Sequence, residues 1–235
     1  MRTCGPVRVD LCLPGGSTTA GPHTNLTAMV AAVSLPPALD GERMDQRVFL
    51  FNKTFRDYES LLAIRGERGS PRMYFLEGTI ELMSPSIDHE GVKTTFARLV
   101  EAFAEERAID LNGYGSWTLK RRAKLRAAEP DECYVVGSTR KKVPDFAIEV
   151  VWTRGGLNKL EIYRELGVRE VWMWSAKRSI EVHALRGDRY EKIGRSEIIP
   201  SIDLAAIGKL LLSTNQTKTV REYRASLRAK PARRG

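Results

Sequence analysis

The chain has 235 residues, of which 42% are hydrophobic and 8% aromatic, which is enough to bury the core of one domain with tails. The formal net charge is +9, but residues 218–234 carry seven basic side chains against one acidic side chain, or +6 of that total. The net charge therefore mostly reports a basic C-terminal segment. It is a weak indication of nucleic-acid binding.

Cysteine usage and hydropathy exclude several classes of protein. Cys4, Cys12 and Cys133 are an odd number for a disulfide framework and lack the spacing of a zinc site, which favours a reducing compartment. No apolar run approaches the roughly 20 residues of a membrane helix. No apolar block follows the N-terminus as it would in a signal peptide. We expect a soluble, cytoplasmic protein without a membrane partner.

Three regions are expected along the chain. Residues 1–45 are rich in Gly, Pro, Ser and Thr, and we expect them to be disordered or loosely attached. Met44 precedes the first strongly patterned segment, so translation could begin there rather than at Met1. Residues 46–212 form the patterned domain, and residues 213–235 form a basic tail that we expect to be solvated.

Apolar periodicity, turn residues and capping residues predict the elements of this domain. The first elements are a helix over 55–66, a hairpin around Glu77 and Gly78, and a long helix starting near Ser86 or Asp88. The apolar side of the first helix consists of Tyr58, Leu61, Leu62 and Ile64. Next come two strands around a basic bend over 112–136, a strand over 144–152, a helix over 158–166, strands over 169–176 and 179–194, and short helices over 204–212 and 219–228. The order α-β-β-β-α-β, followed by further strands, predicts an α/β domain around one central mixed sheet.

The strand over 144–152 carries an acid in an otherwise apolar run. Alternate residues of a strand share a face, so Glu149 lies among apolar neighbours. A carboxylate there is costly unless it is paired, hydrogen-bonded or bound to a metal. Asp145 lies roughly 13 Å away along an extended strand, too far to hold the same cation. We therefore expect a second acid from the preceding strand, where Asp131 would lie beside Glu149 if the two strands pair.

The helix that follows carries a lysine on its apolar face. Lys159, Ile162, Tyr163 and Leu166 recur at i, i+3, i+4 and i+7, and so they share one side of the helix. A helix that follows a strand packs back over the sheet. We therefore expect Lys159 to point toward Glu149.

Two acids and a lysine in one place suit phosphodiester hydrolysis. Asp131 and Glu149 could hold Mg²⁺ or Mn²⁺ with several waters. Such a metal lowers the pKa of a bound water, and the Lys159 ammonium could hold that water or stabilise the transition state. Glu149 and Lys159 could instead form a buried salt bridge without any chemistry.

Four segments together resemble a known nuclease family: LEGTIELMSPSIDHE, AEPDECYVV, PDFAIEVVWT and LNKLEIYRELGVREVWMW. In order and spacing they are similar to the PD-(D/E)XK nuclease superfamily, and most of all to the bacterial Uma-two family of restriction endonuclease-like proteins. The resemblance covers residues from about 55 to 204. It implies an α-β-β-β-α-β core, a divalent metal and a nucleic-acid substrate, with Asp131 as the motif aspartate and Glu149 as the second acid. The superfamily lysine usually stands two residues later, where this chain has Val151, and Lys159 matches a place that the family commonly uses instead.

Other residues are candidates for the site or its surroundings. His89 and Glu90, at the start of the long helix, could join the site, although a core or capping role is the favoured interpretation of His89. Asp145 could shape the far side of the site or cap its strand. The basic segment over 120–126 could contact phosphates or form a solvated hairpin tip. Its basic residues are Lys120, Arg121, Arg122, Lys124 and Arg126.

The sequence therefore predicts an endodeoxyribonuclease that hydrolyses DNA phosphodiester bonds with Mg²⁺ or Mn²⁺. The alternative is a nucleic-acid-binding protein that keeps the nuclease fold with weak or no catalysis. A third reading is an enzyme acting on a small phosphate or nucleotide with the same metal. A homodimer is left open, since nucleases that cut both strands often pair.

Overall fold

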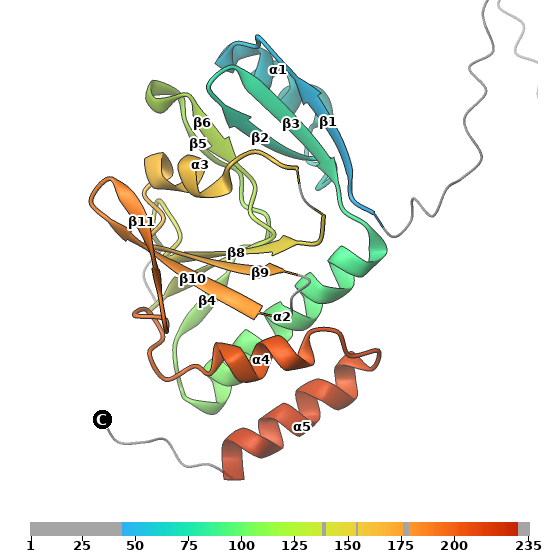
Figure 1. Ribbon diagram of the computed structural model, residues 1–235, viewed down its shortest axis with the longest axis vertical. Helices are drawn as coiled ribbons and strands as arrows, with labels where there is room; N and C mark the ends of the chain where they lie inside the picture. Colours follow the sequence, from blue (N-terminus) through green and yellow to red (C-terminus); the bar gives the residue numbers. More distant parts are fainter. Residues whose placement is uncertain (1–43, 138–139, 154, 176–178, 230–235) are drawn as a thin grey trace, which may run out of the picture. The chain divides into compact units, whose positions relative to one another are not determined.

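The computed structural model describes residues 44–137, 140–153, 155–175 and 179–229, which form five α-helices and two β-sheets (Figure 1). The predicted loose segment over 1–45 lies outside the described residues except for Met44 and Asp45. Within the described residues, the structure contains no helix long and apolar enough to span a membrane.

The six-stranded sheet is mixed and has the strand order β11-β10-β9-β8-β7-β4. Its strands are β4 (Leu111–Gly113), β7 (Glu132–Val136), β8 (Phe146–Val151), β9 (Glu170–Ser175), β10 (Ser179–Arg186) and β11 (Arg189–Ile193). Strands β8 and β9 are parallel, and α3 (Lys159–Leu166) supplies the crossover that parallel neighbours require. Together with α2 (Ile87–Glu106), the order α2-β4-β7-β8-α3-β9 is the predicted α-β-β-β-α-β core, and the predicted fold class is confirmed.

The extra strands form a second sheet, which is antiparallel and has the order β1-β3-β2-β6-β5. Its strands are β1 (Gln46–Leu50), β2 (Arg72–Leu76), β3 (Thr79–Ser84), β5 (Leu119–Arg121) and β6 (Arg126–Ala128). Helix α1 (Phe55–Arg65) covers one face, against which Phe55 and Tyr58 pack. The other face carries Tyr74, which packs with residues of α3 and the six-stranded sheet. This second face therefore closes over the end of β8 that carries Glu149.

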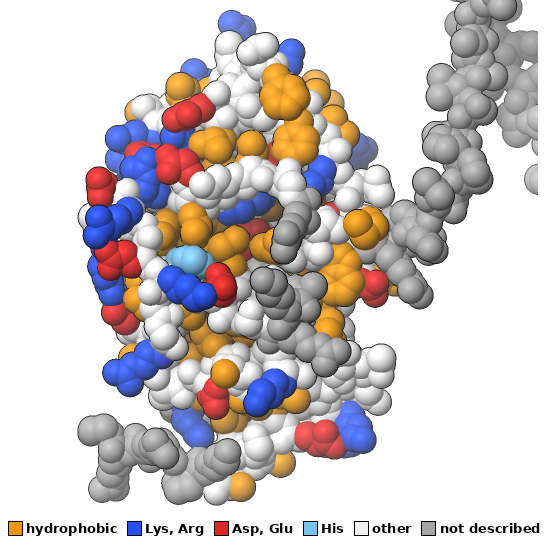
Figure 2. All heavy atoms as spheres, in the orientation of Figure 1, with side chains coloured by type: hydrophobic (Ala, Val, Ile, Leu, Met, Phe, Trp, Pro, Cys, Tyr) orange, Lys and Arg blue, Asp and Glu red, His pale blue; other side chains and the backbone are white. Residues whose placement is uncertain are grey.

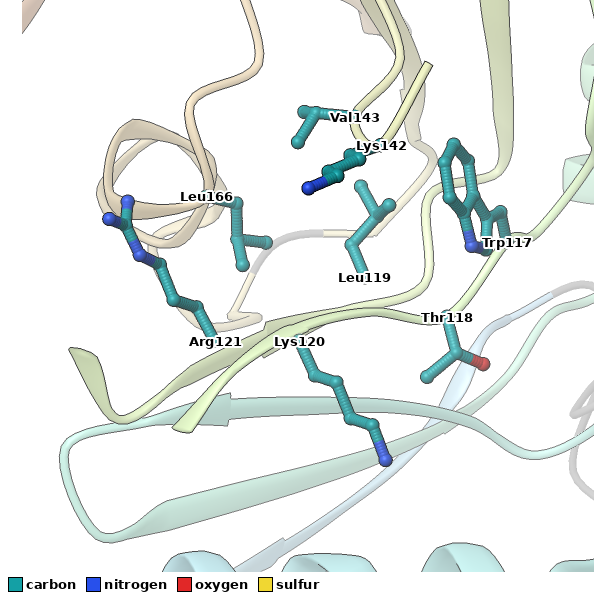
Figure 3. A pocket seen from close by; sticks show the side chains of 8 residues that line it. All are labelled: Trp117, Thr118, Leu119, Lys120, Arg121, Lys142, Val143 and Leu166. Atoms are coloured by element: carbon teal, nitrogen blue, oxygen red, sulfur yellow. The ribbon is translucent and has the colours of Figure 1, made fainter. Parts of the chain in front are cut away.

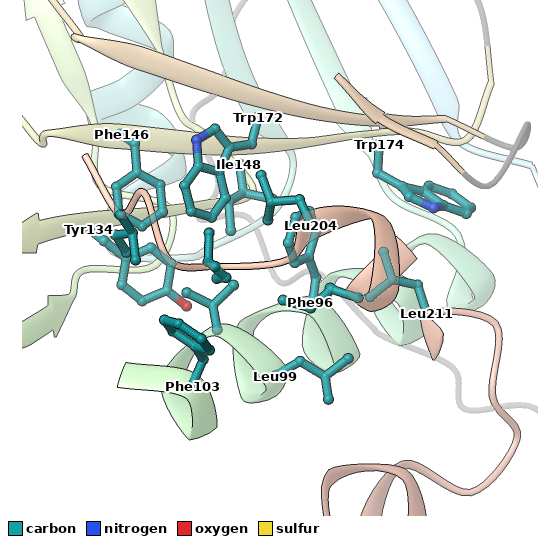
Figure 4. Close-up of a cluster of buried hydrophobic side chains, with 14 of the residues drawn as sticks. Phe96, Leu99, Phe103, Tyr134, Phe146, Ile148, Trp172, Trp174, Leu204 and Leu211 are labelled. Carbon is teal, nitrogen blue, oxygen red and sulfur yellow. The ribbon is translucent and has the colours of Figure 1, made fainter. Parts of the chain in front are cut away.

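The main core lies on the opposite face of the six-stranded sheet, against α2 and α4 (Leu204–Leu210). Aromatic side chains fill it, and Figure 4 shows Phe146 and Trp172 beside each other above the α2 residue Phe96. The Phe146 and Trp172 ring centroids are 4.2 Å apart in a stacked arrangement, a geometry that adds to the area they bury.

Local signals explain where the elements begin and end. The Ser86 side chain caps α2, the Asn158 side chain caps α3, and Gly167 ends α3 in the left-handed conformation. The β2–β3 turn uses positive φ at Glu77 and Gly78, as two-residue hairpins require. The expected apolar side of α1 is wrong at one position, because Ile64 is 77% exposed and the helix packs mainly through its first turns.

The described part of the predicted basic tail is mostly a helix, α5 (Gln216–Ala229), which agrees with the helix predicted over 219–228. This helix packs on the domain, which differs from the expected solvated tail. Tyr223 is buried in the main core. Arg224 and Arg228 form ion pairs with Glu106 at the end of α2. This helix has an apolar side beside its basic residues, and that side packs on α2.

Candidate active site

Glu149 lies on the face of β8 that points away from the main core. Phe146, Ile148 and Val150 occupy the core face, so alternation places Glu149 on the opposite one. Its side chain is only 3% exposed, and it lines a cavity of about 250 Å³ together with Lys159 and the loop before α3. A carboxylate is therefore buried at the wall of a cavity rather than inside packed side chains.

Asp131 immediately precedes β7 and lies beside β8. The two strands pair as predicted, with Glu132 opposite Ile148, and this register continues to Asp131 opposite Glu149. The main-chain N–H of Val150 donates a hydrogen bond to Asp131 Oδ2 at 2.6 Å. The two acids therefore come from adjacent positions on neighbouring strands.

Two further side chains hold the Asp131 carboxylate. Arg72 forms an ion pair with Oδ1, and His89 Nε2 lies 3.0 Å from the same oxygen. His89 Nδ1 lies 3.2 Å from Asp45 Oδ2, so the imidazole bridges two buried carboxylates. Burial would raise the pKa of Asp45, but hydrogen bonds from His89 and the Ser86 N–H lower it to about 2. Asp45, expected in the loose segment, is thus anchored in the folded domain.

Lys159 reaches the same cavity from the first turn of α3. Its Nζ lies over the ring of Tyr74 and has no hydrogen-bond partner among the described residues. Burial lowers the pKa of Lys159 to about 7, although the negative charges of Glu149 and Glu81 oppose that shift. Lys159 and Glu149 line the same cavity, but no hydrogen bond joins the two side chains among the described residues.

Tyr163 is a site residue that the sequence placed only on an apolar helix face. Its hydroxyl donates a hydrogen bond to Glu149 Oε1. Burial, and then the charge of Glu149, raise the pKa of Tyr163 well above its usual range. The hydroxyl therefore keeps its proton and acts as a donor that orients the carboxylate.

Glu81 on β3 is another buried acid near this cavity. It forms an ion pair with Arg47 and accepts a hydrogen bond from the Leu157 N–H at 2.7 Å. Tyr74, which lies under Lys159, is directly opposite Glu81 in the β2–β3 register. The sequence carried the same signal for Glu81 as for Glu149, an acid in an apolar strand, but no role was predicted for it.

Two of the suggested contributors lie away from the cavity. Asp145 accepts a hydrogen bond from a β7 main-chain N–H at 2.9 Å and pairs with Lys141 at 2.6 Å, so it fastens the start of β8. Glu90 is partly exposed, and its ion pair with Arg72 at 2.6 Å links it to Asp131 only indirectly. Of the three suggested contributors, only His89 touches a predicted site residue directly.

The basic segment over 120–126 forms the β5–β6 hairpin. Arg126 is buried and pairs with Glu77 and Glu161, so it is not available to nucleic acid as predicted. The other four basic residues are exposed but already contact protein groups: Lys120 and Arg122 with Glu59, Lys124 with Glu165, and Arg121 with the Glu165 carbonyl. Figure 2 shows acidic and basic side chains intermixed on this face rather than one basic stripe.

Only some of the side chains around Glu149 are suitable ligands for a hard cation such as Mg²⁺. No cluster of three or more His, Cys, Asp or Glu side chains that could hold a metal occurs among the described residues. Mg²⁺, however, is commonly held by one or two carboxylates and keeps several waters. Asp131 and Glu149 provide such a pair, although Arg72 and the Val150 N–H already occupy Asp131. A metal held by these two carboxylates would have to keep most of its waters.

This α-β-β-β-α-β core with its mixed sheet is a restriction endonuclease-like fold. The chain belongs to the Uma2 family, whose sequence model, described as "Putative restriction endonuclease", matches residues 55–207. No curated protein matches the chain. Among solved structures, the chain is similar to "a putative nuclease belonging to DUF820" from Anabaena variabilis. The identity is 12% and the TM-score 0.43, over 69% of this chain and 96% of that chain.

Proposed function

We propose that this protein is a metal-dependent endonuclease that hydrolyses phosphodiester bonds in DNA. The family to which the chain belongs supports a nuclease. The observation that carries the proposal is the cavity where Glu149 and Lys159 are both buried without bonding each other. Burying an uncompensated charge is costly, and a purely structural pair would be expected to bond directly.

Each residue has a defined part in this mechanism. Asp131 and Glu149 would hold Mg²⁺ or Mn²⁺, which when bound would polarise the phosphate and lower the pKa of a water. Tyr163 keeps the Glu149 carboxylate oriented through its hydroxyl. Arg72 and His89 hold the Asp131 carboxylate in the same way. The Nζ of Lys159 is free to hold the attacking water or to stabilise charge on the phosphate oxygens.

One observation favours the alternative, a nucleic-acid-binding protein with weak or no catalysis. Both Asp131 oxygens already accept bonds, one from Arg72 and the other from the Val150 N–H. A metal would have to share this carboxylate with the Arg72 guanidinium. If that ion pair holds, the site would bind metal poorly.

Cleavage of supercoiled plasmid separates the two functions. The full chain should nick the plasmid with Mg²⁺ or Mn²⁺, and chelation should stop the reaction. We expect Glu149→Gln to lower the nicking rate at least about 100-fold, because metal stabilisation of the transition state contributes several kcal/mol. Glu191→Gln, a matched change of a glutamate on β11, should nick normally. Equal nicking by the two variants would overturn the proposed site, and binding without cleavage in either metal would establish the alternative.

A further inference from the structure

A second cavity, of about 330 Å³, lies at the opposite end of α3 from the candidate active site (Figure 3). Lys159, the first residue of α3, lines the Glu149 cavity, whereas Leu166, the last residue, lines this one. Seven helical steps of 1.5 Å each place Lys159 and Leu166 about 10 Å apart along the axis of α3. The mechanism proposed above makes no use of this second cavity.

Strand alternation decides which side chains enter the second cavity. Leu119 and Arg121 are alternate residues of β5 and share one side, and Lys120 points to the other side. Trp117, just before β5, lines the cavity together with Leu119. Figure 3 agrees, with Lys120 directed away and Leu119 beside Leu166. The cavity therefore presents an indole and an aliphatic floor with a guanidinium at one edge.

The charged side chains that line the second cavity are all basic. Lys120, Arg121 and Lys142 are among its lining residues, and no acidic residue is. The Lys142 side chain is exposed, and it is the neighbouring Lys141 that pairs with Asp145. Arg121 donates to the Glu165 carbonyl at 3.0 Å, which uses only part of a group with five N–H donors. Two cations thus remain able to bind an anion beside an aromatic ring.

We propose that this second cavity binds one unstacked nucleotide of a single-stranded nucleic acid. The Trp117 indole would stack on the base, and Lys142 and Arg121 would bind the adjacent phosphate. Stacking on aromatic side chains beside a basic groove is how proteins commonly hold single strands. The volume is near the lower limit of small-ligand pockets, which suits one nucleotide and excludes a duplex.

The position of the second cavity gives it a place in the proposed reaction. A single strand that entered both cavities would run past α3, which lines each of them. The nucleotide would therefore lie on the same strand as the bond cut at the Glu149 cavity. This last step rests on the proposed nuclease function, whereas binding of the nucleotide does not.

Tryptophan fluorescence of the full chain, titrated with a short oligothymidylate in EDTA, tests the binding. Trp172 and Trp174 are buried, and Trp152 stacks on Trp174 against the main core. Quenching by the oligonucleotide should therefore come from Trp117, and Trp117→Phe should remove it. Trp117→Leu should weaken binding, measured by anisotropy of a labelled oligonucleotide, about 5- to 100-fold through lost stacking.

Lys142→Ala should weaken binding of the same oligonucleotide about tenfold. It should also lower the slope of log binding constant against log salt concentration by about 0.7. Lys209→Ala, an exposed lysine on α4, is the matched control and should bind normally.

Several results would overturn this inference. One is a Lys142→Ala variant that binds the oligonucleotide as tightly as Lys209→Ala does. Another is a DNA duplex that binds the protein as tightly as the single strand and quenches Trp117 fluorescence equally. Lys142→Ala changes an exposed loop residue, so it tests the inference even if a Trp117 variant fails to fold. Normal plasmid nicking with no Trp117-dependent binding would reject the second cavity alone. Trp117-dependent binding without any nicking would reject the nuclease and keep the second cavity.

Discussion

Two glutamates are buried on the parallel strands β8 and β9, and their surroundings differ. Glu170 accepts hydrogen bonds from Trp172 Nε1 and Ser196 Oγ, each at 2.8 Å, and from two main-chain N–H groups that follow Ser196. Glu149, equally buried, accepts one hydrogen bond among the described residues, from Tyr163, and it faces a cavity. Glu170 is saturated by the protein, whereas Glu149 keeps capacity for a ligand.

This difference shows that burial alone does not mark a functional acid. A buried carboxylate with four donors is compensated within the fold, and it ties β9 to the segment after β11. A buried carboxylate with one donor remains costly unless something else binds it. The comparison therefore predicts that removing Glu170 costs more stability than removing Glu149.

The largest expected effect is on stability. Glu170→Ala would take the acceptor from the buried Trp172 N–H and from the Glu197 main-chain N–H, whereas the Ile198 N–H keeps the Ser196 hydroxyl. We expect a loss of about 2 kcal/mol or more in the free energy of unfolding. Glu149→Ala should cost less, because it leaves only one donor, the Tyr163 hydroxyl, without an acceptor and also removes a poorly compensated buried charge. Urea denaturation followed by circular dichroism measures both, and equal destabilisation by the two changes would erase the distinction.

The next effect depends on pH and concerns the ammonium beside Glu149. Lys159 has a pKa of about 7 when folded against 10.5 ordinarily, so between these values the unfolded chain binds a proton that the folded chain does not. The stability of the metal-free protein should therefore rise with pH across this window. Lys159→Met should be the more stable protein near pH 7, and this advantage should shrink toward pH 10.5. Denaturation of both proteins at several pH values checks this expectation, and a stability difference that stays constant with pH would contradict it.

The smallest effect concerns the single donor to Glu149. Tyr163→Phe should lower the cleavage rate roughly tenfold, as loss of a group that orients a metal ligand commonly does. Tyr190→Phe is the matched control, since its hydroxyl donates to the Val168 carbonyl, away from the cavity. Both changes remove one buried hydrogen bond and should destabilise similarly, but only Tyr163→Phe should slow plasmid nicking. Equal rates for the two variants would leave Tyr163 with a structural role only.

The local features of this protein could be predicted from its sequence. The ends of α3, the β2–β3 turn and the inward face of α2 follow from capping residues, positive φ and a period of 3.6. The unusual position of Glu149 follows from strand alternation, because the pattern of two residues holds wherever the strand lies. These signals depend on a few neighbouring residues, and they need no knowledge of distant partners.

Tertiary structure decided the rest, because the partners come from distant parts of the chain. Asp45 meets His89, Glu81 meets Leu157, and neither pairing has a signal within its own segment. The alternation that marks Glu149 and Glu170 cannot tell how many donors surround each acid once the chain has folded. That count, which separates a saturated carboxylate from one facing a cavity, is set by how the two sheets and α3 pack together.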